Sequence, residues 1–221
     1  MKKFILSATA IILSAASFAQ FSFGIQGTGN LGSASIKTTD GPNFSKTMKA
    51  LPGAGVVVQY AINEHLAIRS GVNYLQNGVT LKTTIDETVA MKVVVENKLN
   101  YIQVPVNVLY TVPFARVQFF AGAGGYISYG ISGKAKSTLR YTMPDGHEAV
   151  EIDETKAFKK EQDGGAGLKK TDFGIGALAG VRLSSGLFAN VGYQFSLANI
   201  SGSDDVKYKN RGLQLTVGYF F

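Results

Sequence analysis

Few residues in this chain could carry acid–base or metal chemistry. Its 221 residues include two histidines and no cysteine, which excludes a disulfide scaffold, a thiolate metal site and a cysteine nucleophile. His65 lies beside Glu64, and His147 follows Pro144-Asp145-Gly146. Neither has a second ligand at a metal-binding spacing, and a Ser/His/acid set cannot be built from two isolated histidines. We therefore expect no enzyme, no metal and no cofactor.

Two glycine patterns resemble nucleotide-binding fingerprints, Gly122-x-Gly124 and Gly174-x-Gly176-x-x-x-Gly180. A phosphate-binding glycine loop needs a following helix, because the N–H groups at the helix N-terminus hold the phosphate. Both patterns instead lie inside segments that alternate with a period of two residues. We therefore do not expect nucleotide binding.

The first nineteen residues have the pattern of a secretory signal peptide. Lys2 and Lys3 give a positive start, residues 4–16 are apolar, and the small residues Ser17 and Ala19 precede Gln20. This predicts cleavage between Ala19 and Gln20, with residues 20–221 forming one domain. The apolar stretch is shorter than the about 20 residues that a membrane-spanning helix needs.

Apolar residues recur at every second position through most of the remaining chain, which predicts strands. In 101–110, for example, Ile102, Val104 and Val106 share one face, while Gln103 and Asn107 lie on the other. The pattern predicts eight strands, over residues 21–31, 54–62, 66–77, 101–110, 117–131, 173–183, 187–197 and 213–221.

Short and long connections between these segments alternate strictly. The short ones are the turns 62–66, 111–115 and 184–186, and the long polar ones are 32–53, 77–99, 133–172 and 200–210. Transmembrane barrels have this asymmetry, with short periplasmic turns and longer extracellular loops. The sequence therefore predicts an all-β, eight-stranded antiparallel up-and-down transmembrane β-barrel.

The polar faces of the strands decide between a membrane barrel and a soluble barrel of lipocalin type. They carry uncharged groups such as Gln59, Asn73, Gln118 and Thr216, and the central parts of the strands contain no Asp, Glu or Lys. A soluble barrel would present Lys and Glu on its outer face. Small polar groups suit a narrow, filled lumen, so the apolar faces are expected to contact outer-membrane lipid.

Three arginines lie in or near the short turns, and strand parity directs Arg69, Arg116 and Arg182 into the lumen at its periplasmic end. They could hydrogen-bond lumen amides and close the barrel, or they could form a constriction that favours anions. With Arg211 near the outer interface, within reach of lipid phosphate, they carry most of the positive charge left after cleavage. A nucleic-acid patch would need clustered Lys and Arg on one exposed face, which this charge balance does not indicate, so a nucleic-acid partner is not expected.

The final segment resembles the assembly signal of outer-membrane barrels, an alternating strand that ends in an aromatic residue. Its alternating face consists of Leu213, Leu215, Val217, Tyr219 and Phe221. This resemblance implies recognition by the barrel assembly machinery.

Four motifs resemble the PorT-like outer-membrane β-barrel family: 99–110, 119–126, 174–180 and 192–197. Pro105 supports the match, since proline inside a strand removes a ladder donor yet is usual at this place in that family. The resemblance implies an outer-membrane barrel, and the member that gave the family its name is linked to protein secretion. No residue set in this chain carries the secretion role over.

The longest connection, 133–172, contains eight basic and eight acidic residues. Residues 137–143 and 148–152 flank Pro144-Asp145-Gly146, which suggests a hairpin above the membrane. A flexible solvated loop and an extracellular partner site at a hairpin edge both remain open. We expect a non-enzymatic structural or surface-interaction protein, with a narrow solute channel, a secretion component and a soluble ligand-binding barrel as alternatives.

Overall fold

A computed structural model describes residues 20–38, 45–86, 91–142, 147–203 and 206–221. Residues 1–19, the predicted signal peptide, lie outside the described residues. The described chain is almost entirely strand, with one short 3-10 helix, η1 (Glu161–Asp163). The strands are β1 (Phe21–Thr38), β2 (Ser45–Ala61), β3 (Leu66–Asp86), β4 (Met91–Phe114), β5 (Val117–Thr142), β6 (Glu148–Lys156), β7 (Thr171–Leu183), β8 (Leu187–Ser196) and β9 (Val206–Phe220).

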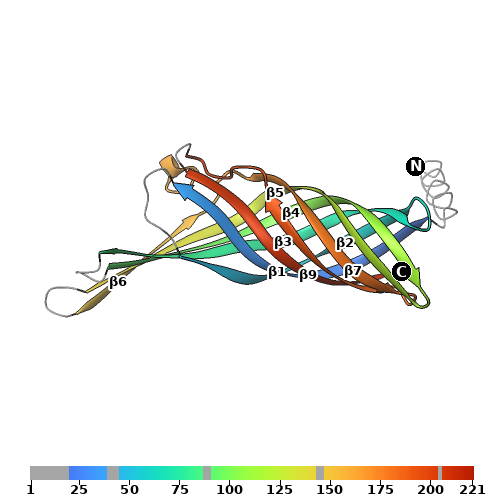
Figure 1. Cartoon of the computed structure of the whole chain (residues 1–221). Coiled ribbons are helices and arrows are strands. Elements are labelled where there is room, and N and C mark those ends of the chain that lie inside the picture. The colour runs from blue at the N-terminus through green and yellow to red at the C-terminus, as the bar shows by residue number, and fades with distance from the viewer. Residues whose placement is uncertain (1–19, 39–44, 87–90, 143–146, 204–205) are drawn as a thin grey trace, which may run out of the picture.

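Eight of the nine strands form a closed antiparallel ring, which confirms the predicted fold (Figure 1). The ring runs β1-β2-β3-β4-β5-β7-β8-β9, and β9 pairs with β1 to close it. Each ring strand pairs with both of its neighbours in the ring, so no ring strand has a free edge over the membrane-spanning part. β6 stands outside the ring and pairs with β5.

The long polar connections were predicted to be loops. This prediction is wrong, because most of their residues belong to strands. β5 is 26 residues long and β4 is 24, more than twice the roughly 9–11 residues that cross a bilayer. Residues 77–86 and 91–99 are strand, and residues 87–90 lie outside the described residues. The predicted hairpin within 133–172 is confirmed and is longer than expected, since Lys134 already pairs with Lys156.

The strands separate into two projections beyond the ring, at the end that we call the projecting end. β1 and β2 pair only as far as Gly32 and Lys49, and β1 then continues with β9 alone. β5 leaves β7 after Tyr129 and continues beside β6. The larger projection, the projecting sheet, is therefore built from β2, β3, β4, β5 and β6, with β6 at its edge (Figure 1).

The opposite end, the turn end, holds the short connections. They are 62–65, 115–116 and 184–186, so residues 111–114 belong to β4 and not to a turn. Ala115 adopts a φ of 52°, a left-handed conformation that favours glycine. The end of β9 lies here too, and the Phe221 N–H donates to the Phe23 carbonyl at 2.8 Å.

The outer wall of the ring is apolar, whereas its inner wall is mainly polar. Phe23, Val108 and Leu215 point outward and are 60%, 55% and 63% exposed. Gln103 and Asn107, on the other face of β4, are buried. An apolar face without cover suits hydrocarbon and would be an aggregation-prone patch in water.

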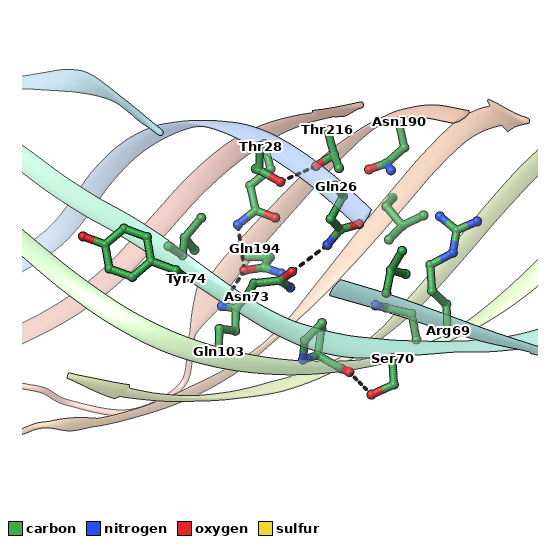
Figure 2. A pocket seen from close by; sticks show the side chains of 16 residues that line it. Gln26, Thr28, Arg69, Ser70, Asn73, Tyr74, Gln103, Asn190, Gln194 and Thr216 are labelled. Carbon is green, nitrogen blue, oxygen red and sulfur yellow. Dashed lines mark hydrogen bonds between the residues drawn. The ribbon is translucent and has the colours of Figure 1, made fainter. Parts of the chain in front are cut away.

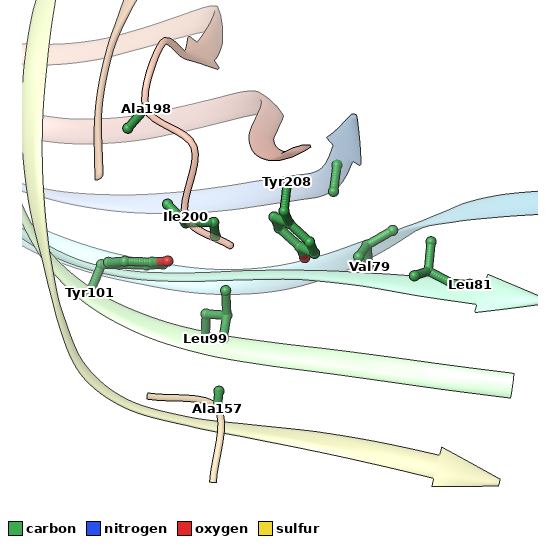
Figure 3. Close-up of a cluster of buried hydrophobic side chains, with 9 residues drawn as sticks. Val79, Leu81, Leu99, Tyr101, Ala157, Ala198, Ile200 and Tyr208 are labelled. Carbon is green, nitrogen blue, oxygen red and sulfur yellow. The ribbon is translucent and has the colours of Figure 1, made fainter. Parts of the chain in front are cut away.

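Beyond the ring, apolar side chains turn inward and fill the space between the two projections (Figure 3). Leu99, Val79 and Ile200 are fully buried there, and Tyr208 of β9 reaches across to them. This mouth cluster consists of Ala34, Val79, Leu81, Leu99, Tyr101, Ala157, Ala198, Ile200 and Tyr208. It covers the lumen at the projecting end.

Candidate functional site: a filled lumen and a projecting sheet

The turn end of the lumen is closed by Arg69 and aromatic rings. Arg69 is 5% exposed, and its Nε and Nη2 donate to Oε1 of Gln59 at 3.0 and 2.8 Å. Its guanidinium carbon lies 4.3 Å from the ring centre of Phe120, 5.1 Å from that of Phe188 and 5.5 Å from that of Phe220. Ring faces attract a cation most strongly where water is excluded. The arginine is therefore held by rings and an amide.

The three arginines predicted to act together occupy different environments. Arg182 of β7 is half-buried and stacks on Phe220 at 4.5 Å, so Arg69 and Arg182 share that ring. Arg116 lies in the turn 115–116, and its side chain is exposed. Arg116 does not contact Phe220. Strand parity would direct its side chain inward, but the turn places the residue beyond the end of the wall.

A network of side-chain amides and hydroxyls crosses the middle of the lumen (Figure 2). Oε1 of Gln194 accepts from Gln103 and from Gln214, each at 3.1 Å, which ties β4, β8 and β9 together. Gln26 donates to Asn73 at 2.7 Å, and Thr28 and Thr216 are 2.9 Å apart. Opposite walls are thus joined by direct hydrogen bonds.

A buried carboxylate lies between this network and the mouth cluster. Asp172 is 3% exposed and accepts from the Ser196 hydroxyl and, at 2.8 Å, from Nδ2 of Asn210. The same Asn210 amide contacts the Tyr101 hydroxyl at 3.3 Å. Among the described residues Asp172 forms no ion pair, so hydrogen bonds are what satisfy its oxygens.

The space left inside the barrel is small. The central cavity, lined by Gln26, Asn73 and Gln194 among others, has a volume of about 50 Å³, and the cavity beside Asp172 about 20 Å³. Since one buried water needs roughly 10–15 Å³, each holds a few waters at most. The lumen is a packed polar core between two plugs, and its geometry does not support a continuous pore.

The projecting sheet offers more surface for binding than the lumen. β6 pairs with β5 on one side, and within the described part of the chain its other edge has no strand partner over most of its length. Val150 and Ile152 on this strand are 51% and 58% exposed. Glu154 binds Lys134 at 2.6 Å, and this hydrogen bond and charge lower the pKa of the Glu154 carboxyl.

The two histidines are far apart along the fold. His65 is exposed in a short turn and stacks on Tyr110 at 5.8 Å, whereas His147 is exposed next to β6. Within the described ranges, no group of three or more His, Asp or Glu side chains could hold a metal ion. The same part of the chain contains no helix that is long and apolar enough to cross a membrane.

The sequence matches a known family over residues 5–221, and that family is described as the outer membrane protein beta-barrel domain. The chain belongs to this family. A search of curated proteins gives no match. The family and the outward apolar wall together identify an outer-membrane β-barrel and exclude the soluble alternative.

Several solved barrels are similar to this outer-membrane barrel. The attachment invasion locus protein Ail of Yersinia pestis is 14% identical with a TM-score of 0.37, and covers 90% of this chain and 99% of its own. OprG of Pseudomonas aeruginosa is 13% identical with a TM-score of 0.48, and covers 92% and 96%. Neisserial surface protein A is 15% identical with a TM-score of 0.37, and covers 90% and 97%.

The sequence analysis did not predict the aromatic rings that close the turn end of the lumen around Arg69. Phe120, Phe188 and Phe220 lie at inward positions of their strands, where the polar face was expected. Their signal was available, because each interrupts an otherwise small or polar face close to a turn. The register across turn 62–65 also pairs Gln59 with Arg69.

Proposed function

We propose that this barrel is a non-conducting, non-enzymatic surface protein whose projecting sheet contacts a partner outside the cell. One observation carries the proposal: β6 stands outside the ring with an open edge, while the lumen is filled. Main-chain pairing along an exposed strand edge is a common mode of recognition. The acidic residues of the edge, Glu151, Asp153 and Glu154, favour a basic partner segment.

The orientation follows from the asymmetry of the two ends. Outer-membrane barrels place short turns in the periplasm and long segments outside, so we assign the turn end to the periplasm. We infer that residues 1–19 are a signal peptide cleaved before Gln20, leaving 20–221 as one domain. We also infer that Leu213, Leu215, Val217, Tyr219 and Phe221 form the signal read by the assembly machinery.

Within the family, the motifs around Pro105 support a PorT-like barrel, and this makes a part in protein secretion the second candidate. Pro105 occupies β4 opposite Tyr126, and its carbonyl accepts from the Ser70 hydroxyl at 2.8 Å. A secretion role would also use the periplasmic turns, which carry Glu64, His65 and Arg116. Loss of secreted protein on replacing these three residues would favour this candidate over the surface role.

The orientation can be tested with single cysteines, because the chain has none of its own. Ile152→Cys lies on the projecting sheet and Glu64→Cys in a short turn, both at exposed positions. A membrane-impermeant maleimide added to intact cells should label only Ile152→Cys. Glu64→Cys should react only after the outer membrane is permeabilised. The reverse labelling pattern would contradict the proposal.

Partner contact can be tested by placing a photoreactive amino acid at Ile152, with Glu64 as the matched site at the other end. Irradiation of intact cells in their native medium should give a cross-linked species at Ile152 only. Planar-bilayer recordings of the purified barrel should show no channel. Stable unitary conductance with no cross-link at Ile152 would favour the channel alternative.

A further inference from the structure

A groove opens on the outer face of the wall where β5 changes its neighbour. The Gly130 N–H donates to the Lys170 carbonyl at 2.7 Å, on the side of β7, and the Ala157 N–H donates to Gly133 at 3.0 Å, on the side of β6. The strand has a register shift against β4 at the same place. The groove has a volume of about 690 Å³.

Among the residues that the structure describes, lysine is the only charged type that lines this groove. Five line it, together with Asn100, Ser132, Gly133 and two apolar residues, Ile131 and Phe158. These groove lysines are Lys98, Lys134, Lys156, Lys159 and Lys170, and all five are exposed. Of the described carboxylates, one forms an ion pair with this set, that of Glu154 with Lys134.

Three of these lysines face one another directly across three strands. Lys98 of β4 is opposite Lys134 of β5, and Lys134 is opposite Lys156 of β6. Like charges at directly opposed positions destabilise a sheet. Glu154 offsets only part of this repulsion, so a bound anion would stabilise the row.

The groove is continuous with the lipid-facing wall. Ile127 and Tyr129 precede it on the outward face of β5 and are 56% and 54% exposed. Nζ of Lys170 lies 5.9 Å from the ring centre of Tyr129. Aromatic residues mark the level at which hydrocarbon gives way to headgroups. The groove lysines therefore lie at headgroup height, on the face that lipid already covers.

We propose that this groove binds the phosphate-bearing headgroup of an outer-leaflet lipid. The lysine ammonium groups would donate to the phosphate oxygens, and Ile131 would contact the first methylenes of the lipid. A lysine beside an anionic lipid surface strengthens binding by about fivefold. The lipid is assigned over a soluble polyanion because the groove continues the apolar wall below it. This inference does not depend on the proposed partner of β6.

The test uses the full barrel purified in detergent, with native mass spectrometry as the readout. The probes are bisphosphorylated lipid A and the same lipid without its phosphates. The variant combines Lys98→Gln, Lys134→Gln and Lys156→Gln. The matched control combines Lys160→Gln, Lys169→Gln and Lys207→Gln, which are exposed lysines outside the groove. Retention of the heat-dependent mobility shift reports folding for both proteins.

The unaltered barrel and the control should retain the phosphorylated lipid, and the groove variant should bind it about a hundredfold more weakly. Should the triple variant not fold, acylation footprinting of the unaltered barrel gives the same answer, since bound lipid should protect the groove lysines. Equal retention of the two lipids, or equal loss in variant and control, would overturn the proposal. Tighter binding of inositol hexakisphosphate than of the lipid would assign the groove to a soluble polyanion instead.

Discussion

The guanidinium carbon of Arg69 lies 4.3 Å from the ring centre of Phe120, across the turn end of the lumen. This buried cation has ring faces and the Gln59 amide as its neighbours, and its Nη1 has no hydrogen-bond partner among the described residues. The side chain thus fills the barrel by packing as much as by charge.

Arg69→Ala should lower the free energy of unfolding by about 2–4 kcal/mol, because it removes the stacked guanidinium and leaves a cavity. Arg69→Met, which keeps the volume and removes the charge, should cost less than about 1 kcal/mol. Urea-induced unfolding in lipid vesicles measures both. Arg116→Ala, at the exposed turn, should change the free energy of unfolding by less than about 0.5 kcal/mol. A loss as large as that of Arg69→Ala would contradict the finding that Arg116 lies outside the packed turn end.

Gln194→Ala should lower the free energy of unfolding by about 2 kcal/mol, because the amides of Gln103 and Gln214 lose their shared acceptor inside the lumen. Gln76 provides the matched control, since its amide donates to the exposed Tyr74 hydroxyl. Gln76→Ala should stay within about 0.5 kcal/mol of the unaltered protein. A similar effect of both changes in the urea measurement would mean that the network does not stabilise the barrel.

Ala115→Gly should raise the free energy of unfolding by about 1 kcal/mol, because Ala115 adopts a φ of 52° that glycine tolerates without strain. Gly186 gives the reverse test in another short turn. It adopts a φ of 97°, and an added Cβ would lie 2.2 Å from the Phe220 carbonyl oxygen. Gly186→Ala should therefore destabilise the barrel, and a neutral result at either turn in urea titrations would count against this reading.

Removing Phe221 should reduce the amount of folded barrel in the outer membrane of cells while leaving the stability of refolded protein nearly unchanged. Its ring is 79% exposed and contributes little packing. Phe23→Ser is the matched control, since Phe23 is an outward aromatic at the same end and is 60% exposed. Equal losses of both variants from membrane fractions would show that Phe221 has no special part in assembly.

Two deletions of different length should separate the hairpin from the mouth cluster. Replacing residues 137–153 by Asn-Gly joins Lys136 to Glu154, which already face each other, and should leave heat resistance unchanged. Deleting 134–170 also removes Ala157 and Leu168, which pack in or against the mouth cluster. That deletion should lower the unfolding temperature in a heat-dependent gel shift, and equal behaviour of the two deletions would contradict the assignment.

The period-two pattern predicted the membrane-spanning half of each strand because one face there meets hydrocarbon throughout. Outside the membrane the pattern inverts. On β4 the outward residues change from Val104 and Ile102 to Lys98, while Leu99 is fully buried on the inner face. The chain remains a strand while its apolar and polar faces change places, and the charged outward residues gave these stretches the composition of loops.

Parity placed Arg69, Arg116 and Arg182 on the inner wall. For Arg116 this is wrong, because the residue lies in the turn 115–116, where the wall ends, and its side chain is exposed. Four of the five groove lysines belong to the stretch 133–172, which the sequence shows as a balanced loop of eight basic and eight acidic residues, and Lys98 belongs to the stretch 77–99. Their separation from the acidic residues depends on the pairing of β4, β5 and β6. This register joins residues far apart in the chain, so local composition could not give it.

β5 runs for 26 residues from the turn end into the hairpin. A pull on the tip along the strand axis would load the β4–β5 hydrogen bonds in shear, all together, and would not peel them apart one at a time. Force applied to the projecting sheet would therefore be transmitted to the barrel wall, and a molecule attached to this sheet would be anchored by the whole barrel.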